Sequence, residues 1–157
     1  MNFSLPTKCK MVQLVNPKTT NASITSDAIS LKNAIKAWIV IEYTQAAGHA
    51  TTPTLRQATD VAIGTNAAGP TARIWANEDT AATDTLVAQT AAASYAVAAD
   101  VKNKQVVFEI DPATLTDGYP CIYFTQATSS QATNFMSATA YILTNFQQAT
   151  PPSAIVD

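Results

Sequence analysis

Short runs of β-branched and aromatic residues, separated by clusters of Gly, Pro, Asn and Asp, constrain the fold of this chain most strongly. One run lies within residues 29–45, ISLKNAIKAWIVIEYTQ, and others follow at TPTLRQA, TARIWAN, DTLVAQT, ASYAVAA, KQVVFEID, CIYFTQA and SATAYILTNF. Such residues favour strands, and many short strands at close spacing are typical of sandwiches and barrels. The sequence therefore predicts an all-β fold, an antiparallel β-sandwich or jelly-roll-like single domain.

The alternation of apolar residues indicates which side chains face the core. In the first run, period two places Ile35, Ala37, Ile39, Ile41 and Tyr43 on one face. The same spacing in later runs selects Val106, Phe108, Ile110, Ile122, Phe124, Ala138, Ala140, Ile142 and Phe146. Two bulky aromatics, Trp38 and Trp75, are expected to complete this core.

Two segments leave the secondary structure less determined. A helix over residues 31–41 is an alternative to the first strand, but its β-branched content favours a strand. The alanine-rich TAAASYAVAAD also fits both, because alanine favours helix; a strand is the preferred interpretation. In DPATLTDGY, Asp111 can cap a helical turn that Pro112 begins and Gly118 ends.

A chain of 157 residues fits one domain, because half that length would bury too little surface to be stable alone. Residues 1–25 are predicted to form an extended N-terminal arm with one edge strand, KMVQLV. Residues 26–147 form the sandwich, and residues 148–157 form a C-terminal arm that Pro151 and Pro152 keep out of a central strand. The arms offer few neighbours, so their apolar residues are candidate contacts for a partner: Leu5, Met11, Leu14 and Ile155.

Charge and composition exclude several classes of partner. Only 13% of the residues are charged and the net charge is −2, which gives no basic surface for nucleic acid. No signal peptide and no apolar run long enough to span a membrane is apparent, so we expect no membrane partner and synthesis in a cytoplasm. In a reducing compartment Cys9 and Cys121 are expected to be free thiols.

The residues needed for an active site are sparse. The only histidine, His49, lies in GHATTPTLRQATD, where no nucleophile elbow accompanies it. We expect that stretch to be a turn followed by a strand, with Arg56 on the solvent face. Two Cys and one His are too few for a zinc site, and no Gly-rich phosphate loop is present.

The acidic residues are also expected to be structural. Glu78, Asp79 and Asp84 in ANEDTAATD do not match a calcium-binding loop and are interpreted as a solvated loop. Glu42 and Glu109 interrupt apolar runs and are expected to face outward on a half-exposed sheet, paired with Arg56, Arg73 or Lys36. The sequence thus predicts no catalytic residue, no cofactor and no metal site, and a protein that is not an enzyme.

The stretches GHATTPTLRQATD, RIWANEDTAATDTLVAQT, VVFEIDPATLTDGYPCI and ATPPSAIVD resemble capsid decoration, or cement, proteins of tailed bacteriophages. The resemblance implies a β-sandwich that forms a dimer or trimer on the exterior of an icosahedral virion, made in the bacterial host cytoplasm. It implies that the protein stabilises the capsid by bridging subunits of the major capsid protein. Alternatives are another virion component, such as a head-completion, tail or fibre-associated protein, or a carbohydrate-binding module that uses Trp38, Trp75 or Tyr95.

Overall fold

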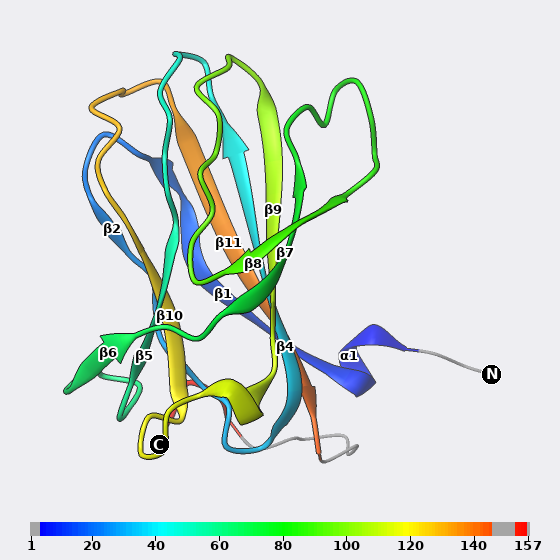
Figure 1. Ribbon diagram of the computed structural model, residues 1–157, viewed down its shortest axis with the longest axis vertical. Helices are drawn as coiled ribbons and strands as arrows, with labels where there is room; N and C mark the ends of the chain where they lie inside the picture. The colour runs from blue at the N-terminus through cyan, green and yellow to red at the C-terminus, as the bar shows by residue number, and fades with distance from the viewer. Residues whose placement is uncertain (1–3, 146–152, 157) are drawn as a thin grey trace.

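The computed structural model describes residues 4–145 and 153–156 and is an antiparallel β-sandwich, as the sequence predicts (Figure 1). Sheet A holds, in spatial order, β1 (Cys9–Thr19), β11 (Phe135–Thr144), β4 (Ala34–Thr44), β9 (Asn103–Ile110), β7 (Ala72–Asn77) and β8 (Val87–Ala92). Sheet B holds β2 (Ile24–Thr25), β10 (Cys121–Gln126), β5 (Thr54–Ala58) and β6 (Asn66–Ala68), and β3 (Ile29–Ser30) also pairs with β10. The helical elements are α1 (Leu5–Lys8) and the 3₁₀ turn η1 (Pro112–Thr114).

The core lies between the two sheets and consists of the alternate residues that period two selects. Ala37, Ile39, Ile41 and Tyr43 of β4 are buried, as are the selected residues of β9, β10 and β11. Phe146 lies outside the described residues. The prediction for Ile35 is wrong: its side chain is 49% exposed. The register explains this, because Lys36 pairs with Leu143 and Ala34 with Thr144, which leaves Ile35 as the extra residue of a bulge.

The prediction that both tryptophans complete the core is also wrong. Trp38 alternates with the buried Ala37 and Ile39, and Trp75 alternates with the buried Ile74 and Ala76. Both side chains therefore lie on the outer face of sheet A, where they are half-buried. Strand parity determines their side of the sheet, whatever their hydrophobicity.

The predicted edge strand KMVQLV lies within β1, which pairs with β11 at one edge of sheet A. Residues near the N-terminus thus complete a sheet whose adjacent strand comes from the other end of the chain. Figure 1 shows this pairing as a blue strand beside an orange one. Leu14 and Val15 of β1 belong to the main hydrophobic core.

The alanine-rich segment and the predicted helical turn have different outcomes. In TAAASYAVAAD, only the first residues belong to β8; beyond them, Ser94 and Val97 form isolated bridges to Thr54 and Thr51. Val97 is fully buried, but its alanine neighbours are too small to build a second packed strand. The predicted turn is η1, where Asp111 Oδ1 accepts a hydrogen bond from Ala113 N (3.0 Å). Gly118 then takes a φ of +81°, which glycine adopts readily.

Candidate interaction surfaces

Three of the four predicted contact residues are exposed. Leu5 in α1 is 39% exposed, Met11 in β1 is 48% exposed and Ile155 is 55% exposed. The prediction is wrong for Leu14, because only 2% of its surface is exposed and its side chain packs in the core. The premise that the N-terminal segment has too few neighbours fails there, since β1 is a full member of sheet A.

The structure brings two of these residues together and separates the third. Met11 and Ile155 line one cavity with Gln13 and Ser153, although 144 residues separate them along the chain. We call these four residues the terminal patch. The C-terminal segment is held there by Ala154, which is buried and whose carbonyl accepts a hydrogen bond from Ser30 N (2.7 Å). Leu5 instead lines a groove on the outer face of sheet A.

The outer face of sheet A carries a continuous set of large apolar side chains that sequence reasoning assigned to the core or left out. The strand registers place Tyr141 opposite Trp38, and Val40 opposite Val107, which in turn lies opposite Trp75. We call this surface, formed by Trp38, Val40, Trp75, Val107 and Tyr141, the aromatic face. The signal in the sequence was the unbroken apolar run AWIVI, which indicates a strand covered on both faces.

A groove of about 510 Å³ crosses the aromatic face. Leu5 of α1 and Leu86, just before β8, contribute to its lining, together with Trp38, Val40, Val107 and Tyr141. Its polar lining comes from Glu42 and Gln105, which lie opposite each other on β4 and β9. The groove is therefore apolar along most of its length and can bury the side chains of a partner.

Charged residues occupy two positions on this face. Glu109 forms an ion pair with Lys36 (2.8 Å between Oε1 and Nζ), and Arg73 lies 3.9 Å from the same oxygen. The hydrogen bond from Lys36 holds the pKa of Glu109 below its usual value. Glu42 lies four residues from Trp38 along β4 and receives one side-chain hydrogen bond, from Ser137 (3.4 Å). The prediction that Glu109 pairs with Lys36 and Arg73 on an outward face is confirmed.

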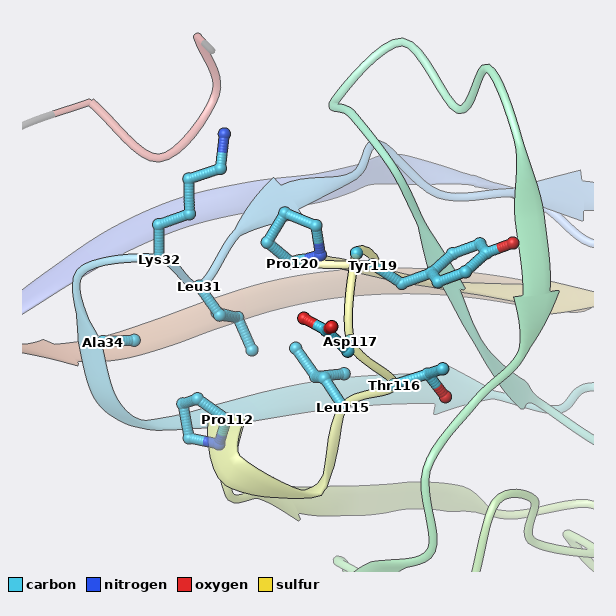
Figure 2. Close-up of a pocket in the computed structure, with 10 residues that line it drawn as sticks. Leu31, Lys32, Ala34, Pro112, Leu115, Thr116, Asp117, Tyr119 and Pro120 are labelled. Atoms are coloured by element: carbon cyan, nitrogen blue, oxygen red, sulfur yellow. The ribbon is translucent and has the colours of Figure 1, made fainter.

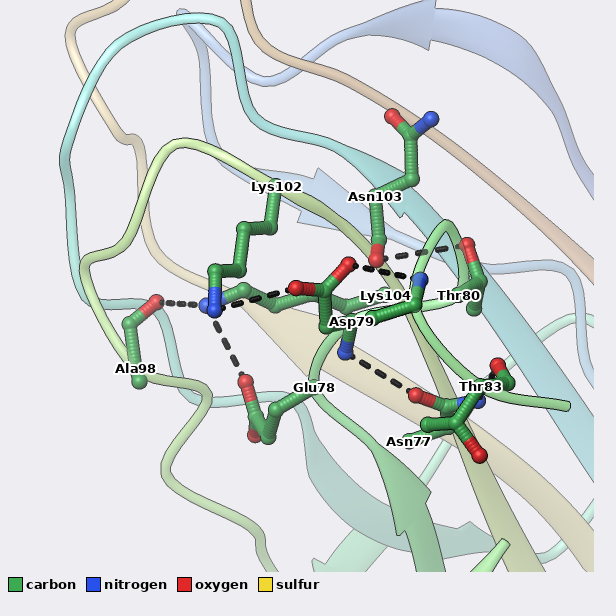
Figure 3. A network of polar contacts seen from close by, with 10 residues as sticks. Asn77, Glu78, Asp79, Thr80, Thr83, Ala98, Lys102, Asn103 and Lys104 are labelled. Atoms are coloured by element: carbon green, nitrogen blue, oxygen red, sulfur yellow. Dashed lines mark hydrogen bonds and ion pairs between the residues drawn. The ribbon is translucent and has the colours of Figure 1, made fainter. Parts of the chain in front are cut away.

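The acidic loop after β7 is fixed by two lysines (Figure 3). Lys104 Nζ is buried, donates to the Ala98 carbonyl (2.6 Å) and lies 3.0 Å from Glu78 Oε2, without hydrogen-bond geometry to that oxygen. Lys102 pairs with Asp79 (3.1 Å) and lowers the pKa of that carboxyl. The described residues contain no group of three His, Cys, Asp or Glu that could hold a metal. This network therefore anchors the loop that carries Leu86 towards the aromatic face.

Two tyrosines next to this network have raised pKa values. Tyr95 donates to Glu78 Oε1 (2.8 Å), and burial together with this carboxylate raises its pKa to about 12. Burial raises the pKa of Tyr43, whose hydroxyl donates to Gln126 Oε1 (2.6 Å). Both hydroxyls are therefore neutral hydrogen-bond donors at physiological pH. Tyr95, one of the three aromatics proposed for sugar stacking, already uses its hydroxyl within the protein.

The segment around His49 is a turn followed by β5, as predicted. Gln45 Nε2 donates to the His49 carbonyl (2.8 Å) across the turn, and the His49 Nδ1 atom is buried without a hydrogen bond among the described residues. Arg56 of β5 is half-buried and donates to Asn66 Oδ1 (2.6 Å) on β6. The Gln45 contact holds the turn after β4, and the Arg56 contact connects β5 to β6.

A second depression lies at one end of the sandwich, between η1 and the turn that precedes β4 (Figure 2). Its apolar lining comes from Leu31, Pro112 and Leu115, and Lys32 and Asp117 also contribute to it. Gln57 ties the loop in place, because its side chain accepts from Thr116 N (2.9 Å) and donates to Thr116 Oγ1 (2.7 Å). The depression, about 420 Å³, is somewhat smaller than the groove on the aromatic face, about 510 Å³.

Cys9 and Cys121 are both buried thiols outside any disulfide, as predicted. Burial raises the pKa of the Cys9 thiol, which keeps it in the unreactive protonated form. Among the described residues, no helix is long and apolar enough to cross a membrane.

Comparison with known proteins yields a likeness of fold alone. No protein-family description matches the chain, and no curated protein is similar in sequence. Among solved structures, the chain is similar to the SPBc2 prophage-derived protein YomS, with a TM-score of 0.50 and 8% sequence identity. The superposition covers 85% of this chain and 91% of YomS, so it extends over nearly the whole sandwich.

Proposed function

We propose that this protein is a structural component of a bacteriophage virion that decorates and stabilises the icosahedral capsid by bridging major capsid protein subunits. The likeness in fold to a prophage-derived protein supports the coarser part, an origin among phage proteins. The finer part extends the resemblance of four sequence stretches to capsid decoration proteins. In this proposal the protein acts on the exterior of the virion as a dimer or trimer and catalyses no reaction.

One observation carries the capsid contact: apolar side chains from both ends of the chain meet at one edge of the sandwich. Met11 and Ile155 of the terminal patch are both about half exposed, and Val156 beside them is 65% exposed. Exposed apolar residues that cluster on a rigid scaffold are typical of protein contacts. Because Ala154 is anchored to β3, the patch is preformed and loses little entropy on binding.

Decoration requires only modest affinity at each site. Contacts repeated around a shell add through multivalency, so a small patch on each copy can increase the resistance of the whole particle to opening. The low share of charged residues, 13%, suits such a role, because short polar and apolar side chains form flat contacts with little charge to desolvate.

The experiment measures binding of the purified chain to capsids that lack it, by co-sedimentation. The double variant Met11→Asp/Ile155→Asp places two charges in the terminal patch, and we expect its affinity to fall at least about tenfold. The matched control is Val87→Asp/Val101→Asp, which adds the same two charges at positions that are 57% and 62% exposed. Unchanged binding of the double variant would contradict the assignment of the patch, and no binding of the wild type would contradict the function.

A second candidate function rests on the groove, where Trp38 and Tyr141 accompany the polar groups of Glu42 and Gln105. Aromatic rings beside hydrogen-bonding side chains are the elements of a carbohydrate site, as on a binding module displayed by a particle. The test is a glycan array: binding by the wild type that is lost in Trp38→Ala, with capsid binding intact, would favour this function. The predominantly apolar lining of the groove favours a protein partner.

A further inference from the structure

The aromatic face is a set of outward apolar side chains that lies on four adjacent strands. Figure 1 shows β11, β4, β9 and β7 side by side across sheet A. Trp38, Val40 and Tyr141 are half-buried within one chain, so each keeps part of its surface available. Tryptophan and tyrosine are enriched in interface centres, where they gain most from exclusion of water.

The apolar surface continues at both ends of these strands. Phe135, at the start of β11 and opposite Thr44, is 45% exposed on the same side. Leu143, at the other end of β11 and opposite Lys36, is half-buried on that side. The outward side chains of β11 are therefore apolar at both ends of the strand and polar in between, at Ser137 and Thr139.

Charge is distributed unequally along the strands. At one end, Lys36 and Arg73 surround Glu109, which leaves one net positive charge. Towards the other end, Glu42 contributes one negative charge, and it has no ion pair among the residues that the structure describes. Glu42 and Glu109 are separated by four residues along β4, because Glu109 lies opposite Trp38. The face thus has a positive end and a negative end, and Asp84 lines a pocket with Glu42 at the negative end.

A second copy of the same face complements this distribution. In a two-fold dimer the same patch contacts itself, so each residue pair occurs twice. If the axis runs across the strands near Val40 and Val107, the rotation places the row of Trp38, Glu109 and Arg73 of one copy over the row of Glu42 and Gln105 of the other. An axis along the strands would place like charges together, which costs free energy. The charges therefore select one of the two face-to-face arrangements.

We propose that the aromatic face is the homo-oligomer interface, and that two copies pack through it as a two-fold dimer with Arg73 and Lys36 of each copy against Glu42 of the other. The groove supplies the central apolar contact. This inference rests on the proposed oligomeric virion protein and adds its interface and geometry. The terminal patch adjoins this interface at the β1 edge, because Met11 lies opposite Tyr141 on the same face of sheet A.

The test is charge reversal followed by mixing, measured by sedimentation velocity of the purified full-length chain. Glu42→Lys alone gives two positive ends, and Arg73→Glu alone gives two negative ends, so we expect each variant to dimerise at least about tenfold more weakly. An equimolar mixture of the two variants should form a heterodimer with near wild-type affinity, because one contact becomes Lys with Glu and the other stays Glu with Arg. Arg73 is 76% exposed and Glu42 is exposed, so both variants retain the fold.

Matched controls make the same charge changes elsewhere. Asp100→Lys changes an exposed loop, and Arg56→Glu changes sheet B; both are expected to dimerise as the wild type does. A monomeric wild type at all concentrations, or a mixture no stronger than its components, would overturn the inference. Because particles are absent from this assay, such a result would leave capsid binding and the proposed function to their own test.

Discussion

The outer faces of the two sheets differ in how far their apolar side chains are covered. On sheet B, Tyr123 and Cys121 point outward, and the chain covers them with Ala28, Val61 and Ile63 to form a second small core. On sheet A, the side chains of the aromatic face other than Val107 remain only partly buried. An apolar outer face can therefore be covered by the same chain or by a partner, and the strand pattern alone does not distinguish these two cases.

The cover over sheet B is a built feature of the loop after β5. Ile63 adopts a φ of +59°, a conformation that β-branched residues rarely take. Asp60 holds the loop, since its Oδ1 accepts from Gly64 N (3.0 Å), and this hydrogen bond lowers the pKa of Asp60. Strain of this kind persists only where the surroundings impose it. No loop of comparable packing covers Trp38 and Tyr141 among the described residues.

The largest effect on stability is expected from a substitution beneath the loop that covers the outer face of sheet B. Tyr123→Ala removes a side chain that is 3% exposed and leaves a cavity beneath the loop. We expect the free energy of unfolding to fall by about 3 kcal/mol, measured by chemical denaturation. A loss within the range of surface substitutions would show that the second core does not close sheet B.

Truncation of a side chain in the aromatic face is expected to weaken mainly the association of two copies. Trp38→Ala removes an aromatic ring that is only half-buried in one chain. We expect the monomer to lose about 1 kcal/mol of stability, whereas the dissociation constant of the dimer rises at least about tenfold. Denaturation and sedimentation on the same samples measure both quantities. Equal losses of stability in Trp38→Ala and Tyr123→Ala would remove the contrast between the faces.

The smallest effect is a pH-dependent one at the positive end of the aromatic face. The lowered pKa of Glu109 means that its ionised form stabilises the fold above the unfolded-state pKa, and that this contribution is lost as pH falls through the folded-state value. Glu109→Gln should therefore be less stable than the wild type at neutral pH by about 0.5 kcal/mol. The difference should begin to shrink as the pH falls below about 4.3, the unfolded-state pKa of a glutamate, and vanish below the lower folded-state pKa. A constant difference across this range would show that the ion pair with Lys36 contributes nothing.

The inner faces of the sandwich could be predicted from period two because each strand has one buried face. The turn at η1 was also predictable, since Asp111 and Pro112 carry local signals. What could not be predicted depends on strand order. Leu14 is buried because β1 pairs with β11 from the far end of the chain, and Arg73 approaches Glu109 because β7 lies beside β9.

The positions of the two tryptophans show most clearly where prediction from hydrophobicity fails. Hydrophobicity favoured the core, because tryptophan is a highly buried residue on average. Parity within AWIVI and TARIWAN places both outside, beside the core residues that it also selects. The same parity, applied without regard to size, would have located the aromatic face from the sequence.

The proposed decoration role can be tested by quantitative mass spectrometry on purified virus particles from the source of this gene, in which the copies of this chain are counted against those of the major shell protein. We expect a ratio near one or a simple fraction of it, because a decoration protein occupies repeated positions over the shell. A few copies per particle would contradict shell-wide decoration and indicate a head-completion, tail or fibre position. Complete absence from the particle would contradict the virion assignment itself.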